Sequence, residues 1–207
     1  MTAPTRSRIL GSMTAAPAGL SAAQYLALEA ATGPEDPRHE LWDGELRPMA
    51  GTSPDHNAAV FEIRSALSRS FRTADSARAR RDCRVFSESV RVRLSDTRYA
   101  YPDVVAACPP EFRDEPRPPT LLNPELVIEV LSPSTEDYDR GRKLRGYQAL
   151  DTVRQVVLVS LELKQAELHL RQPDGAWLYR PCAGTIPLAD GWPPLDLDAL
   201  VAASQLS

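Results

Sequence analysis

Cysteine and long apolar runs are scarce in this sequence. The three cysteines, Cys83, Cys108 and Cys182, lie far apart and form no CxxC pair, so we expect neither a disulfide framework nor a structural zinc site. A reducing cytoplasm is then the expected compartment. No apolar run approaches the ~18 residues that span a bilayer, and the N-terminal stretch lacks the apolar core of a signal peptide, so we expect neither membrane insertion nor export.

An excess of positive charge is also absent. The sequence has 28 acidic residues against 24 Lys and Arg, a net charge of -4 and a pI near 5.5. This balance argues against a protein that coats nucleic acid through its overall field, but it leaves local patches open. The 207 residues, 43% of them hydrophobic, suit a single domain, which we expect over residues 20–207 behind a flexible tail at residues 1–19.

Apolar periodicity predicts helices and strands in mixed order. Helices are expected at residues 22–32, 54–72, 135–150 and 197–203. Strands are expected in a hairpin around Asp43-Gly44, at residues 83–94, 98–108, 126–131 and 154–162, and in a hairpin around residues 173–175. The proline-rich residues 108–124 are expected to form a mobile loop. The order predicts a mixed α/β or α+β domain with a central sheet.

One charged residue interrupts an apolar strand. Glu129 lies within the run Leu-Val-Ile-Glu-Val-Leu at residues 126–131, which is typical of a strand buried on both faces. An unpaired carboxylate in such a place costs several kcal/mol, so a cation must lie against it. The candidates are an arginine, a lysine and a metal ion.

Lys143 is the candidate lysine. Glu129 lies ~10 Å back from its strand end at ~3.3 Å per residue, and a helix that starts near Thr135 and folds back over the sheet carries Lys143 to a similar depth, ~12 Å along at ~1.5 Å per residue. Lys143 and Lys164 are the two lysines of the sequence, and a lysine, unlike an arginine, can lose its proton. The alternative is an exposed ion pair between Asp139 and Lys143 on the helix surface.

Asp103 is the second candidate acid. It follows Pro102 at the entry of a strand, and strands adjacent in sequence are usually neighbours, so we expect Asp103 to face the region of Glu129. Two converging carboxylates form a hard-oxygen site suited to Mg²⁺ or Mn²⁺, and a nearby lysine can orient or activate a water for phosphodiester hydrolysis. The alternative places Asp103 in a turn and pairs Glu129 with an arginine.

Several short motifs resemble one family of proteins. These are DGEL at residues 43–46, SPDHN at 53–57, YPDVV at 101–105, and above all LVIEVLSPST with DRGRKLRGY within residues 126–147. Over about residues 20–200 the sequence resembles the Uma family of restriction endonucleases, a branch of the PD-(D/E)XK nuclease superfamily. The resemblance implies a restriction-endonuclease-like mixed sheet flanked by helices, and an endonuclease that hydrolyses DNA with Mg²⁺ or Mn²⁺.

The resemblance also implies roles for individual residues. Asp103 and Glu129 would be the metal-binding acids, Lys143 the catalytic lysine, and the backbone carbonyl of Val130 a further metal ligand. Glu45 and His56 would line the same site, with Glu45 as a further catalytic residue. Without the resemblance, Glu45 reads as an exposed residue beside a turn and His56 as a surface or packing histidine.

One position departs from the superfamily pattern. The usual lysine falls two residues after the glutamate, where this sequence has Leu131, so activity would depend on Lys143 from the neighbouring helix. The departure motivates a second hypothesis, a catalytically inactive nuclease-like module that binds nucleic acid or another partner. A third is hydrolysis of a phosphoester outside nucleic acids. A homodimer is expected by resemblance to related restriction-type nucleases.

Arginines outnumber acids between Glu62 and Arg98. Such a stretch could follow the phosphate backbone of DNA, or it could be a solvated face with interleaved ion pairs. The arginines concerned are Arg64, Arg69, Arg72, Arg78, Arg80, Arg81, Arg84, Arg91, Arg93 and Arg98.

Overall fold

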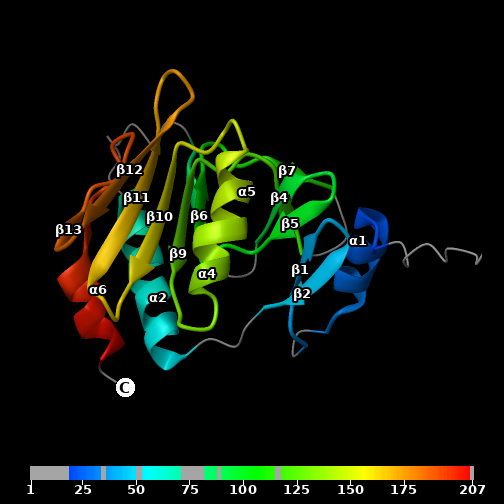
Figure 1. The fold of residues 1–207 in the computed structure, drawn as a ribbon, viewed down its shortest axis with the longest axis horizontal. Helices are drawn as coiled ribbons and strands as arrows, with labels where there is room; N and C mark the ends of the chain where they lie inside the picture. The colour runs from blue at the N-terminus through cyan, green and yellow to red at the C-terminus, as the bar shows by residue number, and fades with distance from the viewer. Residues whose placement is uncertain are drawn as a thin grey trace, which may run out of the picture.

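A computed structural model describes residues 19–33, 36–49, 53–70, 82–87, 90–114 and 118–205. It contains two six-stranded sheets and a short two-stranded one, with helices against them (Figure 1). This mixed α+β architecture confirms the predicted fold class. Apart from Gly19, the tail predicted at residues 1–19 lies outside the described residues. Within the described part of the chain, no helix is long and apolar enough to cross a membrane.

The first six-stranded sheet contains the strand with Glu129. Its order is β12 (Trp177–Cys182), β11 (Gln165–Arg171), β10 (Gln155–Ser160), β9 (Leu126–Val130), β6 (Val104–Ala107) and β3 (Arg84–Ser87). β9 and β10 pair in parallel, and the other neighbours are antiparallel. All residues of β6, β9 and β10 are buried, as the continuous apolar runs predict.

The second six-stranded sheet lies beside the first. Its order is β2 (Glu45–Pro48), β1 (His39–Trp42), β5 (Arg98–Ala100), β4 (Arg91–Ser95), β8 (Thr120–Leu121) and β7 (Phe112–Arg113). The hairpin of β1 and β2 turns at Asp43 and Gly44, which both have positive φ, as the Asp-Gly pair predicts. The small sheet pairs β13 (Thr185–Ile186) with β14 (Leu195–Asp196).

Helices cover both faces of the first sheet. α2 (Pro54–Arg69) and α6 (Leu197–Ser204) pack together on one face, where they share an apolar cluster with alternate residues of β6, β9 and β10. On the other face a helical segment lies between the two sheets (Figure 1). It consists of α4 (Glu136–Tyr138), the π-helical turn η1 (Asp139–Lys143) and α5 (Leu144–Gln148). α1 (Ala22–Ala31), capped by Ser21, packs against β1.

Three predicted segments differ from the structure. Residues 83–94 and 98–108, each predicted as one strand, divide into β3 with β4 and β5 with β6, and each pair contributes to both large sheets. Alternation reports which face of a strand is buried, but not which sheet the strand joins. Residues 108–124 are not wholly irregular, because β7 and β8 pair there between the prolines. Residues 115–117 lie outside the described residues.

The expectation that the cysteines form no disulfides was wrong. Cys83 and Cys108 form a disulfide, 25 residues apart in sequence. The antiparallel register of β3 and β6 pairs Arg84 with Ala107, so the residues just beyond them lie opposite each other. No local spacing could reveal a pair made by strand register. The expectation of a reducing cytoplasm rested on unpaired cysteines and loses that support.

Gly146 in α5 allows the helical segment to approach the second sheet closely. A Cβ added there would lie 2.8 Å from Leu94 Cδ1 and 3.0 Å from Trp42 Cη2, and both side chains are buried. We expect Gly146→Ala to lower the free energy of unfolding by about 1–2 kcal/mol, because overpacking outweighs a helix-propensity gain of about 1 kcal/mol.

Gly141→Ala is the matched control for denaturant titrations. Its added Cβ meets Arg145 Nη2 at 3.8 Å, an ordinary contact with a mobile side chain. This variant should be as stable as the wild type or more so. Equal stability of the two variants would contradict the close-approach argument.

Candidate active site

Two carboxylates meet because β6 and β9 are antiparallel neighbours. Val104 pairs with Ile128, so Asp103, at the entry of β6, lies opposite Glu129 near the end of β9. The Asp103 N–H donates to Glu129 Oε2 at 3.2 Å, and the Val130 N–H donates to Asp103 Oδ2 at 2.7 Å. The alternative, in which Asp103 lies in a turn away from Glu129, does not hold, because the two residues are in contact.

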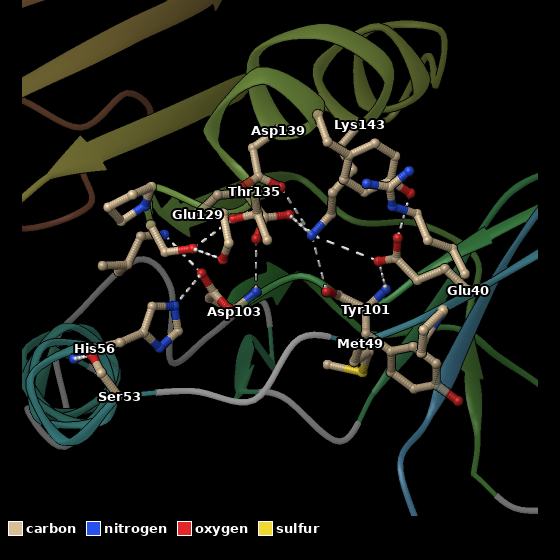
Figure 2. Close-up of a pocket in the computed structure, with 17 residues that line it drawn as sticks. Glu40, Met49, Ser53, His56, Tyr101, Asp103, Glu129, Thr135, Asp139 and Lys143 are labelled. Carbon is tan, nitrogen blue, oxygen red and sulfur yellow. Dashed lines mark hydrogen bonds and ion pairs between the residues drawn. The ribbon is translucent and has the colours of Figure 1, made fainter.

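Lys143 is the cation against Glu129. Its Nζ lies 2.8 Å from Glu129 Oε1, and it donates to the Tyr101 carbonyl at 3.3 Å (Figure 2). Asp139, one turn earlier, lies 3.6 Å from the same Nζ. Both side chains of this pair are buried, so the alternative of an exposed helix-surface pair was wrong. Tyr147, one turn after Lys143, donates its hydroxyl to Glu129 Oε1 at 2.7 Å.

Glu40 completes the surroundings of Lys143, and the sequence analysis missed it. This buried residue of β1 places Oε1 3.6 Å from Lys143 Nζ and accepts the Tyr101 N–H on the same oxygen at 3.0 Å. Its Oε2 accepts hydrogen bonds from the Tyr138 hydroxyl and Trp42 Nε1. The sequence contains a signal for this role: Glu40 directly precedes the apolar residues Leu41 and Trp42, so it is a charged residue in an otherwise apolar strand segment, as Glu129 is.

The resemblance implied that Glu45 lines the site, but the structure places it elsewhere. Its side chain is 59% exposed and pairs with Arg142 at 2.9 Å, outside the cavity. The hairpin register explains the difference, because Glu45 pairs with Trp42 at the turn, whereas Glu40 lies two residues further from it on β1. The acid that β1 and β2 bring to the site is therefore Glu40.

His56 reaches Asp103 from the opposite side. It lies in the first turn of α2, whose N-cap Ser53 accepts the His56 N–H at 3.1 Å. The His56 Nε2 lies 3.1 Å from Asp103 Oδ2 (Figure 2). The Ser-Pro start thus orients α2 so that the histidine points at the acid, as the resemblance implied.

These side chains line one cavity of about 390 Å³. The acids, His56 and Lys143 line it together with hydroxyl-bearing residues, Arg47, Pro48, Met49, Val130 and Pro133. The hydroxyl-bearing residues are Ser53, Tyr101, Ser132, Ser134, Thr135 and Tyr138. The cavity thus presents several charged and hydroxyl groups that can bind a polar substrate or water.

Burial and mutual charge perturb the ionisation of the site. Burial opposes the charged form of Asp103, but His56, Lys143 and the Val130 N–H outweigh it and lower the pKa of Asp103. Burial raises the pKa of Glu129 well above its usual range despite the charge of Lys143. Burial also opposes a charged Lys143, but Glu129 and the neighbouring acids prevail and raise the pKa of Lys143 well above its usual range. Lys143 is accordingly an ammonium ion.

The donor set fits a hard divalent cation with few protein ligands. Asp103 and Glu129 offer carboxylate oxygens, and the Val130 carbonyl leaves the strand on the same side as the N–H that meets Asp103. Within the described residues, no cluster of three or more His, Cys, Asp or Glu side chains could hold a metal on its own. Mg²⁺ commonly binds through one or two carboxylates and keeps several waters, which this set allows.

The described arginines of the stretch between Glu62 and Arg98 differ in exposure and in partners. Arg91 is fully buried and donates to Thr120 Oγ1 and the Pro118 carbonyl. Arg93 pairs with Asp96, while Arg84 and Arg98 pair with aspartates at 2.6 Å. This favours the alternative of interleaved ion pairs for these residues. Arg72, Arg78, Arg80 and Arg81 lie outside the described residues.

The low pKa of Asp103 predicts a pH dependence of stability. A carboxylate whose pKa is lowered by folding stabilises the fold above its unfolded pKa of ~3.9, and this contribution is lost as pH falls through the folded-state pKa. His56→Leu removes the largest interaction that lowers this pKa. We expect the variant to lose more unfolding free energy at pH 7 than at pH 3 in denaturant titrations, and an equal loss would contradict this role of His56.

Comparisons with known proteins point to one family. A family model described as "Putative restriction endonuclease" (Uma2) matches residues 22–199. Two Synechocystis proteins, both described as uncharacterized, are similar. The protein slr1290 is 32% identical over 142 residues, covering 68% of this chain and 70% of its own length. The protein sll1609 is 29% identical over 167 residues, covering 80% and 88%.

A solved structure supports the fold. The crystal structure of a "putative nuclease belonging to DUF820" from Anabaena variabilis superposes with a TM-score of 0.66 at 17% identity, covering 86% of this chain and 98% of that chain. At this identity the likeness concerns the fold, which is restriction-endonuclease-like. Because the family model spans nearly the whole described structure, this chain belongs to the Uma2 family of restriction-endonuclease-like proteins.

Proposed function

We propose that this protein is a metal-dependent endonuclease that hydrolyses phosphodiester bonds of DNA. Membership of the Uma2 family supports a hydrolase that acts on nucleic acid. One observation carries the finer proposal: Asp103 and Glu129 lie at facing positions of β6 and β9, with the Lys143 ammonium 2.8 Å from Glu129. Two acids and a lysine around a polar cavity suit phosphodiester hydrolysis.

Asp103, Glu129 and the Val130 carbonyl would hold Mg²⁺ or Mn²⁺. A divalent ion held there would supply Lewis-acid chemistry, polarising a phosphoryl oxygen and lowering the pKa of bound water. His56 orients Asp103 through the contact with Oδ2, and Tyr147 and Lys143 orient Glu129 through Oε1. Lys143, held as an ammonium ion, contributes positive charge where negative charge develops on the phosphate.

Lys143 takes over the role of the missing strand lysine. Leu131, two residues after Glu129, is buried in the apolar cluster beneath α5. A charged lysine side chain at this position would be unfavourable among apolar neighbours. The η1 turn, whose wider helical spacing moves the chain relative to an α-helix, brings Lys143 to Glu129 instead. The departure at Leu131 is thereby compensated in this proposal.

The proposal predicts that Glu129→Gln loses activity with the fold intact. The near-isosteric amide keeps the volume but removes the charge that binds a cation. We expect Mg²⁺-dependent nicking of supercoiled plasmid to fall by at least about 100-fold, as for other groups that stabilise transition-state charge. Asp103→Asn should behave similarly, and calorimetry should show weaker Mn²⁺ binding by both variants.

Glu45→Gln is the control for this experiment. Glu45 is exposed, pairs with Arg142 and lies outside the cavity, so its variant should cleave as the wild type does. Wild-type protein that neither nicks any DNA or RNA nor binds Mn²⁺ would refute the enzyme proposal. DNA binding that persists in chelator and in Glu129→Gln, without cleavage, would identify an inactive binding module, and turnover of other phosphoesters alone would identify a different substrate class.

Assembly and location remain predictions. A homodimer would allow two active sites to cut both strands of a duplex, and light scattering of the purified chain tests it directly. We propose a cytoplasmic location, and fractionation of expressing cells tests it.

A further inference from the structure

Arg47 lies on β2 directly across the hairpin from Glu40, which faces Lys143. Cross-strand neighbours of opposite charge usually form an ion pair. Here both oxygens of Glu40 are already engaged. Oε1 accepts the Tyr101 N–H and faces Lys143, and Oε2 accepts the Tyr138 hydroxyl.

The Arg47 guanidinium is stacked on an aromatic ring instead. Its Cζ lies 3.9 Å from the centre of the Tyr138 ring, and the half-buried side chain lines the cavity. Among the residues that the structure describes, no carboxylate lies within ion-pair distance of Arg47. A guanidinium stacked on a ring directs its N–H groups outward in its own plane, where they can donate to a planar or tetrahedral anion.

Acids outnumber cations in the lining of the cavity. Four acids line it, namely Glu40, Asp103, Glu129 and Asp139, against the fixed cations Lys143 and Arg47. Lys143 is enclosed by three of these acids, so its charge is largely compensated. Arg47 is the lining cation, within the described residues, that has no carboxylate at ion-pair distance. Arg47 is therefore the lining cation best placed to bind a polyanion.

We propose that Arg47 binds a backbone phosphate that flanks the scissile one, and so positions the nucleic acid strand across the cavity. Successive contacts through Tyr138, Glu40 and Lys143 link Arg47 to Glu129, so Arg47 would contact a part of the substrate other than the reacting phosphate. The inference rests on the proposed nuclease function and names the group that holds its substrate. Arg47 is a positioning residue, since it does not touch the Asp103–Glu129 pair.

The test measures DNA binding in chelator, where no cleavage occurs. Affinities of wild type and Arg47→Gln for a labelled oligonucleotide duplex are determined from 50 to 200 mM salt. We expect Arg47→Gln to bind on the order of tenfold more weakly at low salt for every sequence tried, because a charged hydrogen bond is lost. Its plot of log affinity against log salt should be shallower by about one unit, the effect of one phosphate contact.

Arg142→Gln is the matched control. Arg142 is also a partly exposed arginine near this hairpin, but it pairs with Glu45 and does not line the cavity, so its loss should leave the salt slope unchanged. Arg47→Lys keeps the charge but loses the planar stack, and should retain the slope with reduced affinity. In Mg²⁺, Arg47→Gln should raise KM more than it lowers kcat.

The outcomes separate this inference from the proposed function. If the wild type binds and cleaves DNA and Arg47→Gln binds with the same affinity and slope, the role of Arg47 is refuted while the nuclease proposal stands. If Arg142→Gln changes the slope as much as Arg47→Gln does, the effect is general surface charge and the specific contact is again refuted. If the wild type neither binds nor cleaves nucleic acid, both proposals fail together.

Discussion

The buried ammonium of Lys143 is the constraint on which the site depends. Glu129 on β9, Glu40 on β1 and Asp139 on η1 all lie within 3.6 Å of its Nζ. A charged lysine inside a protein requires such partners, and the acids in turn require the lysine, because either alone would leave an uncompensated buried charge worth several kcal/mol. The cluster therefore joins both large sheets and the helical segment between them at one point (Figure 2).

The same cluster accounts for how the chemistry is positioned. Tyr101 lies between β5 and β6, and its backbone donates to Glu40 and accepts from Lys143, so the passage from one sheet to the other is part of the site. Asp103 follows two residues later and meets Glu129 and His56. Acids, lysine and histidine are thus held by backbone that packing on both sheets makes rigid, as a catalytic arrangement requires.

Much of the candidate site could be predicted from local patterns. Continuous apolar runs predicted buried strands for Glu129 and Asp103, helix and strand rises predicted the depth of Lys143, and Ser53-Pro54 predicted the helix that carries His56. The residues alone predicted an exposed Glu45 beside a turn, and it lies there; the resemblance implied that it lines the site, whereas the acid of this hairpin that reaches the cavity is Glu40. The disulfide and the division of two strands between sheets depend on register, which no single segment encodes.

The sequence by itself determined the element types, the buried acid that needed a cation and the motifs of the family, because helix and strand periodicity, capping and turn preferences act over a few residues. Tertiary structure alone decided that Glu40 joins Lys143, that Cys83 meets Cys108, and that Arg47 is stacked on Tyr138. These contacts join residues far apart in the chain. They form because the packing of two sheets around one buried charge selects which side chains share the space.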